Sequence, residues 1–166
     1  PGSSLSSRTR IKSLVEQTRR DNARFFANLA EVDFRTLKQL AKRQLSGLSA
    51  QNAIFFGMNL EGAQLQGADL RGADLRGCNL RGCDLRGAKL MDAQLLRADL
   101  RDAKLGPLPI AQGRVLRTDL TRANLRFADL RYSSLINARF LEADLSGAKM
   151  DSADLRGAEM EVLAQT

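Results

Sequence analysis

The chain of 166 residues carries a formal net charge of +7 at pH 7 and contains no histidine and no tryptophan. Without histidine it lacks the commonest general base and the usual partner in catalytic triads and metal sites, and two cysteines alone argue against a zinc site. We therefore expect a protein that is not an enzyme, with no catalytic, cofactor-binding or metal-binding residues.

The first 50 residues form a basic segment, in which ten Lys and Arg face four Asp and Glu. From about Arg8 to Leu29 the apolar residues follow helical spacing, with an interruption at Asn22. A second helical pattern begins after Asp33, a plausible N-cap, and ends at Gly47; its apolar positions are Phe34, Leu37, Leu40, Ala41 and Leu45. The sequence therefore predicts a basic helical segment over residues 1–50.

This segment has two possible roles. A helix can cover the open hydrophobic end of a repeat structure, which such proteins require for solubility. A basic amphipathic helix can instead bind an anionic membrane or a nucleic acid. We favour the cap. Two stretches, Ala27-Asn28-Leu29 and Val32-Asp33-Phe34, also match the five-residue pattern described next, but we favour a helix there because the repeat fails immediately after them.

A repeat of five residues organises the rest of the chain. Between Leu60 and Leu90 a leucine falls on every fifth position, and from Leu65 onward an alanine or cysteine stands two places before each leucine. This period is neither that of a helix nor that of a simple strand, and fixed self-similarity indicates a solenoid. The small and the large residue, two apart, point to the same side of an extended segment, so the Asp or Asn between them faces water.

The recurring A(D/N)LRG motif closely resembles the pentapeptide repeat family, and its phase holds from Phe55 to Met160. The resemblance implies a right-handed, four-sided parallel β-helix in which four repeats complete one coil. We therefore expect a mainly β fold, with the solenoid over residues 51–166 and the N-terminal α-helical segment as a cap. The family includes DNA-mimicking inhibitors of topoisomerases, but residues 51–166 hold sixteen Lys and Arg against fifteen Asp and Glu. This near-neutral balance makes DNA mimicry of a topoisomerase substrate unlikely.

Two local features interrupt the regular pattern. Cys78 and Cys83 occupy the small inward position of consecutive repeats, which predicts reduced, buried thiols. Residues 106–115 include Pro107 and Pro109, which cannot donate ladder hydrogen bonds, so this segment is expected to form a bulge or an exposed loop. Because the segment has ten residues, we expect the repeat phase and the coil count to continue unchanged after it.

Stacking residues twenty apart predicts where a partner binds. One outward column then contains an exposed apolar stripe of Leu96, Leu116 and Ile136, which calls for a partner or a cover. The predicted rim of this stripe adds an apolar neighbour and several arginines: Leu141, Arg81, Arg97, Arg101, Arg117 and Arg122. A second candidate on the next two faces is Phe127 with Tyr132, flanked by Arg126 and Arg131.

Together these features favour a non-catalytic protein–protein interaction scaffold that needs no cofactor. The alternative is binding of an anionic membrane or nucleic acid through the basic N-terminal helix. With no apolar run of about 18 residues, we expect a soluble, bacterial, cytoplasmic protein. The last repeats reach Met160 without a following helix of ordinary length, which predicts a weak end-to-end homodimer.

Overall fold

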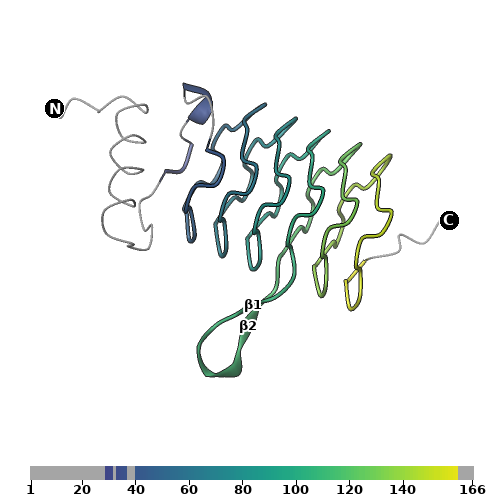
Figure 1. The fold of residues 1–166 in the computed structure, drawn as a ribbon. Helices are drawn as coiled ribbons and strands as arrows, with labels where there is room; N and C mark the ends of the chain where they lie inside the picture. The colour runs from purple at the N-terminus through teal and green to yellow at the C-terminus, as the bar shows by residue number, and fades with distance from the viewer. Residues whose placement is uncertain (1–28, 32, 37–39, 161–166) are drawn as a thin grey trace.

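The structure is a computed structural model, and it describes residues 29–31, 33–36 and 40–160. The chain winds into a stack of similar coils, from which one hairpin projects (Figure 1). Single residues of successive coils pair in parallel, twenty positions apart: Gln44 with Gln64, Ser49 with Asp69, Ile54 with Asp74, and Asn59 with Asn79. Since these pairs follow one another every five residues, each coil has four sides, as the repeat predicts.

Regular elements in the described part of the chain are short. A 3-10 helix, η1, spans Phe34–Thr36, and a second, η2, spans Ala111–Gly113. The strands β1 (Leu108–Pro109) and β2 (Val115–Leu116) pair antiparallel, with Leu108 opposite Leu116. All other sheet pairing between coils consists of the parallel one-residue bridges.

Each corner is a tight turn that explains the glycine of the repeat. At one corner the Ala63 N–H donates to the Leu60 carbonyl oxygen over 3.0 Å, and Gly62 has φ +67°. Such a turn requires positive φ at its third residue, where glycine is unstrained. Several corners carry another residue in this left-handed position, among them Asp92, Arg97, Arg122, Phe127 and Tyr132.

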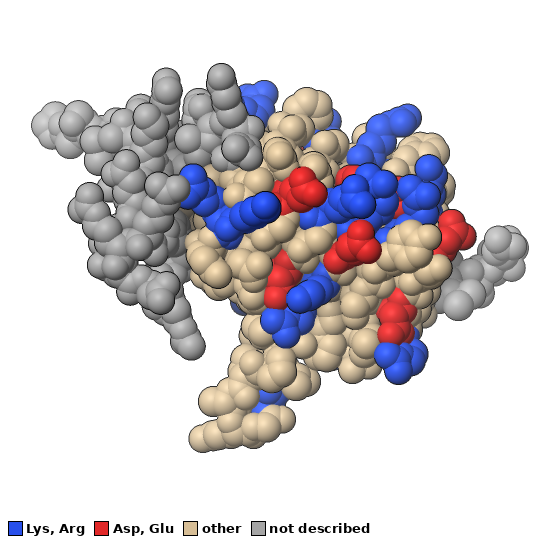
Figure 2. Space-filling model, viewed as in Figure 1, with Lys and Arg blue, Asp and Glu red and all other residues tan. Residues whose placement is uncertain are grey.

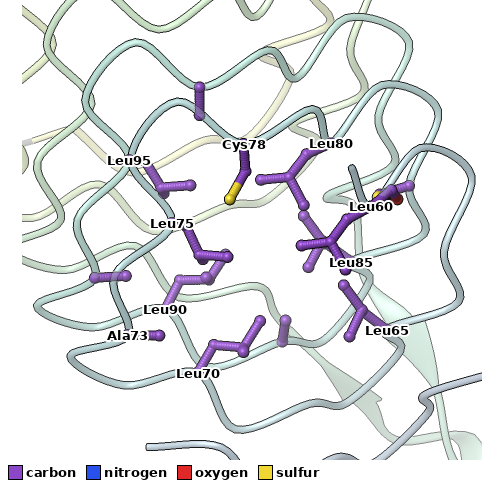
Figure 3. Close-up of a cluster of buried hydrophobic side chains, with 14 of the residues drawn as sticks. Leu60, Leu65, Leu70, Ala73, Leu75, Cys78, Leu80, Leu85, Leu90 and Leu95 are labelled. Carbon is purple, nitrogen blue, oxygen red and sulfur yellow. The ribbon is translucent and has the colours of Figure 1, made fainter. Parts of the chain in front are cut away.

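The core is a set of leucine and alanine columns. Leu80 and Leu85 are completely buried, as are the alanines two positions before many of the other core leucines. Figure 3 shows the leucines of adjacent sides pointing toward one another across the narrow interior, with Cys78 among them. The inward and outward alternation expected from the sequence is therefore confirmed.

The two cysteines are free and buried. Each thiol donates to a backbone carbonyl oxygen, Cys78 to that of Phe55 over 3.0 Å and Cys83 to that of Leu60 over 2.8 Å. Burial raises the pKa of both thiols to about 12. The nucleophilic thiolate is therefore scarce at neutral pH.

We expect a thiol reagent to label Cys78 and Cys83 slowly in the native protein and rapidly in denaturant. Burial and the raised pKa both oppose reaction, so labelling should require unfolding. Mass spectrometry of labelled protein over time gives the two rates. Fast labelling without denaturant would contradict the buried position of these side chains.

Residues 40–50 belong to the solenoid, which corrects the helix expected over Phe34 to Leu45. Leu40, Leu45 and Leu48 are buried in the core, and the backbone of this stretch pairs with the next coil. Leu29 and Phe34 are buried as well, so the alternative five-residue assignment is right for them. The expected boundary between residues 50 and 51 thus falls within the coils. Residues 8–28 of the predicted cap lie outside the described residues.

The segment after Leu105 also differs from expectation. Coils before it pair with a step of twenty residues, but Lys89 pairs with Asp119 and Lys104 with Ser134, a step of thirty. The ten extra residues leave the coil as the β1–β2 hairpin. The expected exposed loop and the unchanged five-residue phase are therefore confirmed, whereas stacking residues twenty apart across this segment is wrong.

At the other end, the last described coil is less enclosed than the others. Ala153, Leu155 and Ala158 are only partly buried against the core, and Met160 is 42 % exposed. An end of this kind offers a surface to another chain. The weak end-to-end homodimer stays a prediction, which sedimentation at two salt concentrations would test.

Candidate interaction surfaces

Seven outward arginines are held by an aspartate two residues earlier. In one such pair the Arg76 guanidinium donates to both carboxylate oxygens of Asp74, over 2.8 Å each, and the Arg76 backbone N–H donates to the same group. This lowers the pKa of the Asp74 carboxyl below its ordinary value. The same arrangement recurs at Asp33–Arg35, Asp69–Arg71, Asp84–Arg86, Asp99–Arg101, Asp129–Arg131 and Asp154–Arg156. Figure 2 accordingly shows blue and red side chains interspersed over the coils.

We expect the free energy of unfolding to be nearly constant from pH 8 to pH 5 and to fall below about pH 4. The chain has no histidine to titrate in the upper range. The paired aspartates, such as Asp74 and Asp129, have a folded pKa below the ordinary value. Their contribution is present above the unfolded pKa and is lost as pH falls through the lower folded pKa. Urea unfolding at several pH values measures this, and a marked decline between pH 8 and 5 would contradict it.

The structure separates Leu96 from Leu116 and Ile136 of the predicted apolar column, which both lie at the hairpin corner. Across the step of thirty, Arg97 donates its backbone N–H to the Arg126 carbonyl oxygen over 2.9 Å, so Leu96 lies beside Arg126. Leu116 is part of β2, and Ile136 lies beneath Gly106, on a different corner from Leu96. Stacking by twenty is wrong here because the hairpin residues occupy no coil position. The stripe therefore does not exist as a continuous surface.

The arginines expected to rim that stripe are likewise distributed over the four corners. Arg101 is held by Asp99, and Arg81 lies 3.7 Å from Asp102. Arg117 pairs with Glu159 over 2.7 Å, whereas Arg122 pairs with Asp92 over 2.9 Å. The half-buried Leu141 accepts a backbone hydrogen bond from Arg122 and shares its corner. A role in binding for these residues stays a prediction.

Most residues of the hairpin are exposed. Its tip turns through η2, where Gln112 and Gly113 have positive φ, and the Ile110 N–H donates to the Arg114 carbonyl oxygen over 2.8 Å. Val115 is 52 % exposed and Leu116 42 %. Figure 1 shows the hairpin projecting away from the coils, and in Figure 2 it is largely uncharged.

Thr118 fixes the neck of the hairpin. Its hydroxyl accepts from the Gly87 N–H over 3.0 Å and lies 3.2 Å from the carbonyl oxygens of Leu85 and Gly106, to one of which it donates. The hydroxyl thus supplies an acceptor at the point where the chain leaves the ladder. Sequence reasoning missed this role, although a threonine at the small inward position was the signal for it.

The second predicted candidate, Phe127 and Tyr132, lies at two consecutive corners. Phe127 is 48 % exposed and Tyr132 62 %, and both have positive φ. The guanidinium carbons of Arg97 and Arg126 lie 5.1 and 5.7 Å from the centre of the Phe127 ring. Sequence reasoning placed Arg97 with the apolar stripe, and the step of thirty brings it to Phe127 instead.

Within the described residues, no group of His, Cys, Asp or Glu is arranged to hold a metal ion. The same residues contain no helix with the length and apolar character needed to cross a membrane. Many aspartates on the sides of the coils are engaged with arginines, as described above.

Comparison with curated proteins finds matches over short stretches of the chain. The chain is 72% identical over 39 residues to a glucosamine-6-phosphate deaminase of Arthrobacter sp. (strain FB24), and 67% identical over 39 residues to the enzyme of that name from Pseudarthrobacter chlorophenolicus. These matches cover 24% of this chain and 15% of each relative. The chain thus spans about 15% of the length of the curated relatives it matches.

Solved structures of other repeat proteins are also similar. HetL, a pentapeptide repeat protein from the cyanobacterium Nostoc sp. strain PCC 7120, aligns with a TM-score of 0.48 and 23% identity, over 87% of this chain and 92% of HetL. QnrB1, a plasmid-mediated fluoroquinolone resistance protein, aligns with a TM-score of 0.45 and 23% identity, over 80% of this chain and 62% of that one. The family model for pentapeptide repeats matches residues 44–77, 68–106 and 118–160 in eight copies. Because these ranges make up most of the sequence, the chain belongs to the pentapeptide repeat family.

Proposed function

We propose that this chain is a non-catalytic protein-interaction scaffold and that the β1–β2 hairpin is its main contact with a partner. Pentapeptide repeat proteins are generally non-catalytic. The observation that carries the proposal is an apolar projection, Val115 and Leu116, held out from a rigid stack of coils. Exposed apolar side chains on a fixed support are typical of protein-binding sites.

The neck supports the proposal because it fixes the direction of the hairpin. Leu108 and Leu116 pack over Gly87, where an added Cβ atom would lie 2.8 and 3.1 Å from their Cβ atoms. The Thr118 hydroxyl bonds the neck to the coil before it. A projection that is already ordered loses less conformational entropy when it binds.

The charge of the hairpin indicates the kind of partner. No acidic residue occurs between Asp102 and Asp119, whereas Lys104, Arg114 and Arg117 are basic. Arg114 is exposed and forms no ion pair with any described residue. We therefore propose a protein partner with an apolar groove and an acidic rim, to which Arg114 supplies the complementary charge.

Site-specific photo-crosslinking in cells of the source organism tests this function. A photo-crosslinking amino acid in place of Val115 should capture a partner protein, and the same group in place of Arg81, exposed on another corner, should not. Arg114→Glu should reduce capture from position 115, because it reverses the charge that meets the acidic rim. Lys89→Glu, an exposed change outside the hairpin, is the matched control.

Two results would overturn the proposed function. Equal capture from positions 115 and 81 would mean that the hairpin is not the contact. If Arg114→Glu left capture unchanged, the partner would not meet Arg114 with an acidic rim. In both cases circular dichroism must first show that the variants fold as the original chain does.

A further inference from the structure

We propose that a second corner of the solenoid binds an acidic protein segment through Arg97 and Arg126, arranged on the ring of Phe127. We name it the aromatic corner; its turns are Phe56–Gly57, Arg76–Gly77, Leu96–Arg97, Arg126–Phe127 and Ser146–Gly147. From the hairpin corner at Arg86–Gly87 the chain turns at Met91–Asp92 and then at Leu96–Arg97. Two turns of a four-sided coil lead to the opposite corner. The site is therefore separate from the hairpin and goes beyond the proposed function.

The conformation of Phe127 is the first observation. It has φ +57° at the turn position that glycine occupies in about half of the described corners. Such a conformation is disfavoured for a bulky side chain. The ring remains 48 % exposed and lies over the backbone of Gly147, where an added Cβ would be only 2.5 Å from it. The strain does not serve the buried core, which suggests that the exposed ring has a use.

The two arginines on this ring are the second observation. Seven other outward arginines are held by an aspartate two positions earlier, but Asn124 stands there before Arg126, as Asn79 does before Arg81. The nearest carboxylate oxygen to Arg126, that of Asp144, lies 3.9 Å from its Nε, compared with 2.6 to 2.8 Å between nitrogen and oxygen in the aspartate-held pairs. Arg97 has no acidic partner among the described residues.

Stacking on Phe127 leaves the N–H groups at the edges of both guanidinium groups free to bind. These groups form paired, charge-assisted hydrogen bonds with carboxylates. The two arginines belong to successive coils, which lie about 4.8 Å apart. In an extended peptide, alternate side chains are about 6.6 Å apart, so two acidic residues of one segment can reach both arginines.

Carboxylates fit the corner better than a nucleic acid does. The guanidinium groups cover Phe127, so a nucleobase would find little free ring on which to stack. Asp99, Asp129 and Asp144 lie on the flanking sides and would repel a continuous row of phosphates. A short peptide with separate carboxylates avoids this repulsion, because its acidic groups need only meet Arg97 and Arg126.

The test uses the whole chain and NMR spectra of the arginine Nε–Hε groups. The probe is an extended peptide of alternating Glu and Thr, with a Gln–Thr peptide of the same length as its neutral counterpart. We expect the glutamate peptide at millimolar concentration to shift the signals of Arg97 and Arg126 in a saturable way. The signal of Arg71, which Asp69 holds on another corner, should not move.

Variants separate a binding role from a structural one. Arg97→Gln with Arg126→Gln should weaken peptide binding about tenfold, as expected for loss of charge-assisted hydrogen bonds, and Arg71→Gln should not. Phe127→Gly should also weaken binding, yet leave the unfolding midpoint near that of the original chain, because glycine relieves the positive φ. Equal shifts at Arg71, no shift at all, or stronger shifts with single-stranded DNA of the same length would overturn the proposal.

Discussion

Replacing Leu80 by alanine is expected to lower the free energy of unfolding by about 2–5 kcal/mol. Leu80 is completely buried in a column of leucines from successive coils. The neighbouring leucines are fixed by the backbone ladder, for example by the hydrogen bond from the Leu80 N–H to the Asp99 carbonyl oxygen. They cannot move inward to fill the space, so the full cost of a cavity should appear in urea unfolding.

Arg76→Ala is the matched control. The Arg76 side chain points outward, is about half exposed and pairs with Asp74. Exposed ion pairs contribute about 0–1 kcal/mol, so the loss should be small. Similar losses at Leu80 and Arg76 would contradict the inward and outward alternation.

Gly87→Ala is the second change with a large expected effect. Gly87 has φ +69°, where alanine is strained by about 1–2 kcal/mol. The added Cβ would also lie 2.8 Å from the Cβ of Leu108 in the hairpin neck. That atom is next to the backbone and cannot rotate away, so the neck must shift, at a further cost of about 1–3 kcal/mol.

Gly77→Ala isolates the contribution of the neck. Gly77 has φ +64°, and an added Cβ would meet nothing within 4 Å. Its replacement should therefore cost only the strain. Thermal or urea unfolding of both variants gives the difference between their losses of stability. In a chain that lacks residues 107–116, the two losses should be equal. If Gly77→Ala were as damaging as Gly87→Ala, the hairpin would not pack where the structure places it.

The sequence predicts the regular solenoid because the five-residue period of small and large apolar residues is continuous over many repeats. The position of Leu80 in a five-residue period decides which side of the backbone it occupies, and burial follows from that. The same reasoning places Cys78 and Cys83 in the core, where they are found. Only a repeat of this regularity allows the core to be assigned residue by residue.

The N-terminal part was harder to predict because two patterns overlap. The spacings of three and four residues from Phe34 through Leu37 and Ala41 to Leu45 also suit a helical face. In addition, Asp33 pairs with Ile54, a step of twenty-one. This single extra residue shifts the phase between Phe34 and Leu40, so the repeat is hidden in the sequence although both residues are buried in the solenoid core.

The candidate sites depended on which residues stack across the hairpin. These residues are thirty positions apart, and the sequence does not reveal this spacing. An insertion of ten residues is two repeats long, so the phase at Leu120 is the same whether the insertion fills a coil or leaves it. Only Pro107 and Pro109 indicated an exposed loop. As a result the partners of residues beyond the hairpin were misassigned, including the contact between Arg97 and Phe127.

We infer that the coils form a self-supporting scaffold from which the hairpin projects. Removing residues 107–116 tests this most directly, because it joins Gly106 to Arg117 and restores a corner of two residues before Thr118. We predict a single cooperative unfolding transition in urea with a midpoint close to that of the original chain. Loss of cooperativity, or a fall in stability as large as that of Leu80→Ala, would show that the ten residues are part of the coil and would contradict the account.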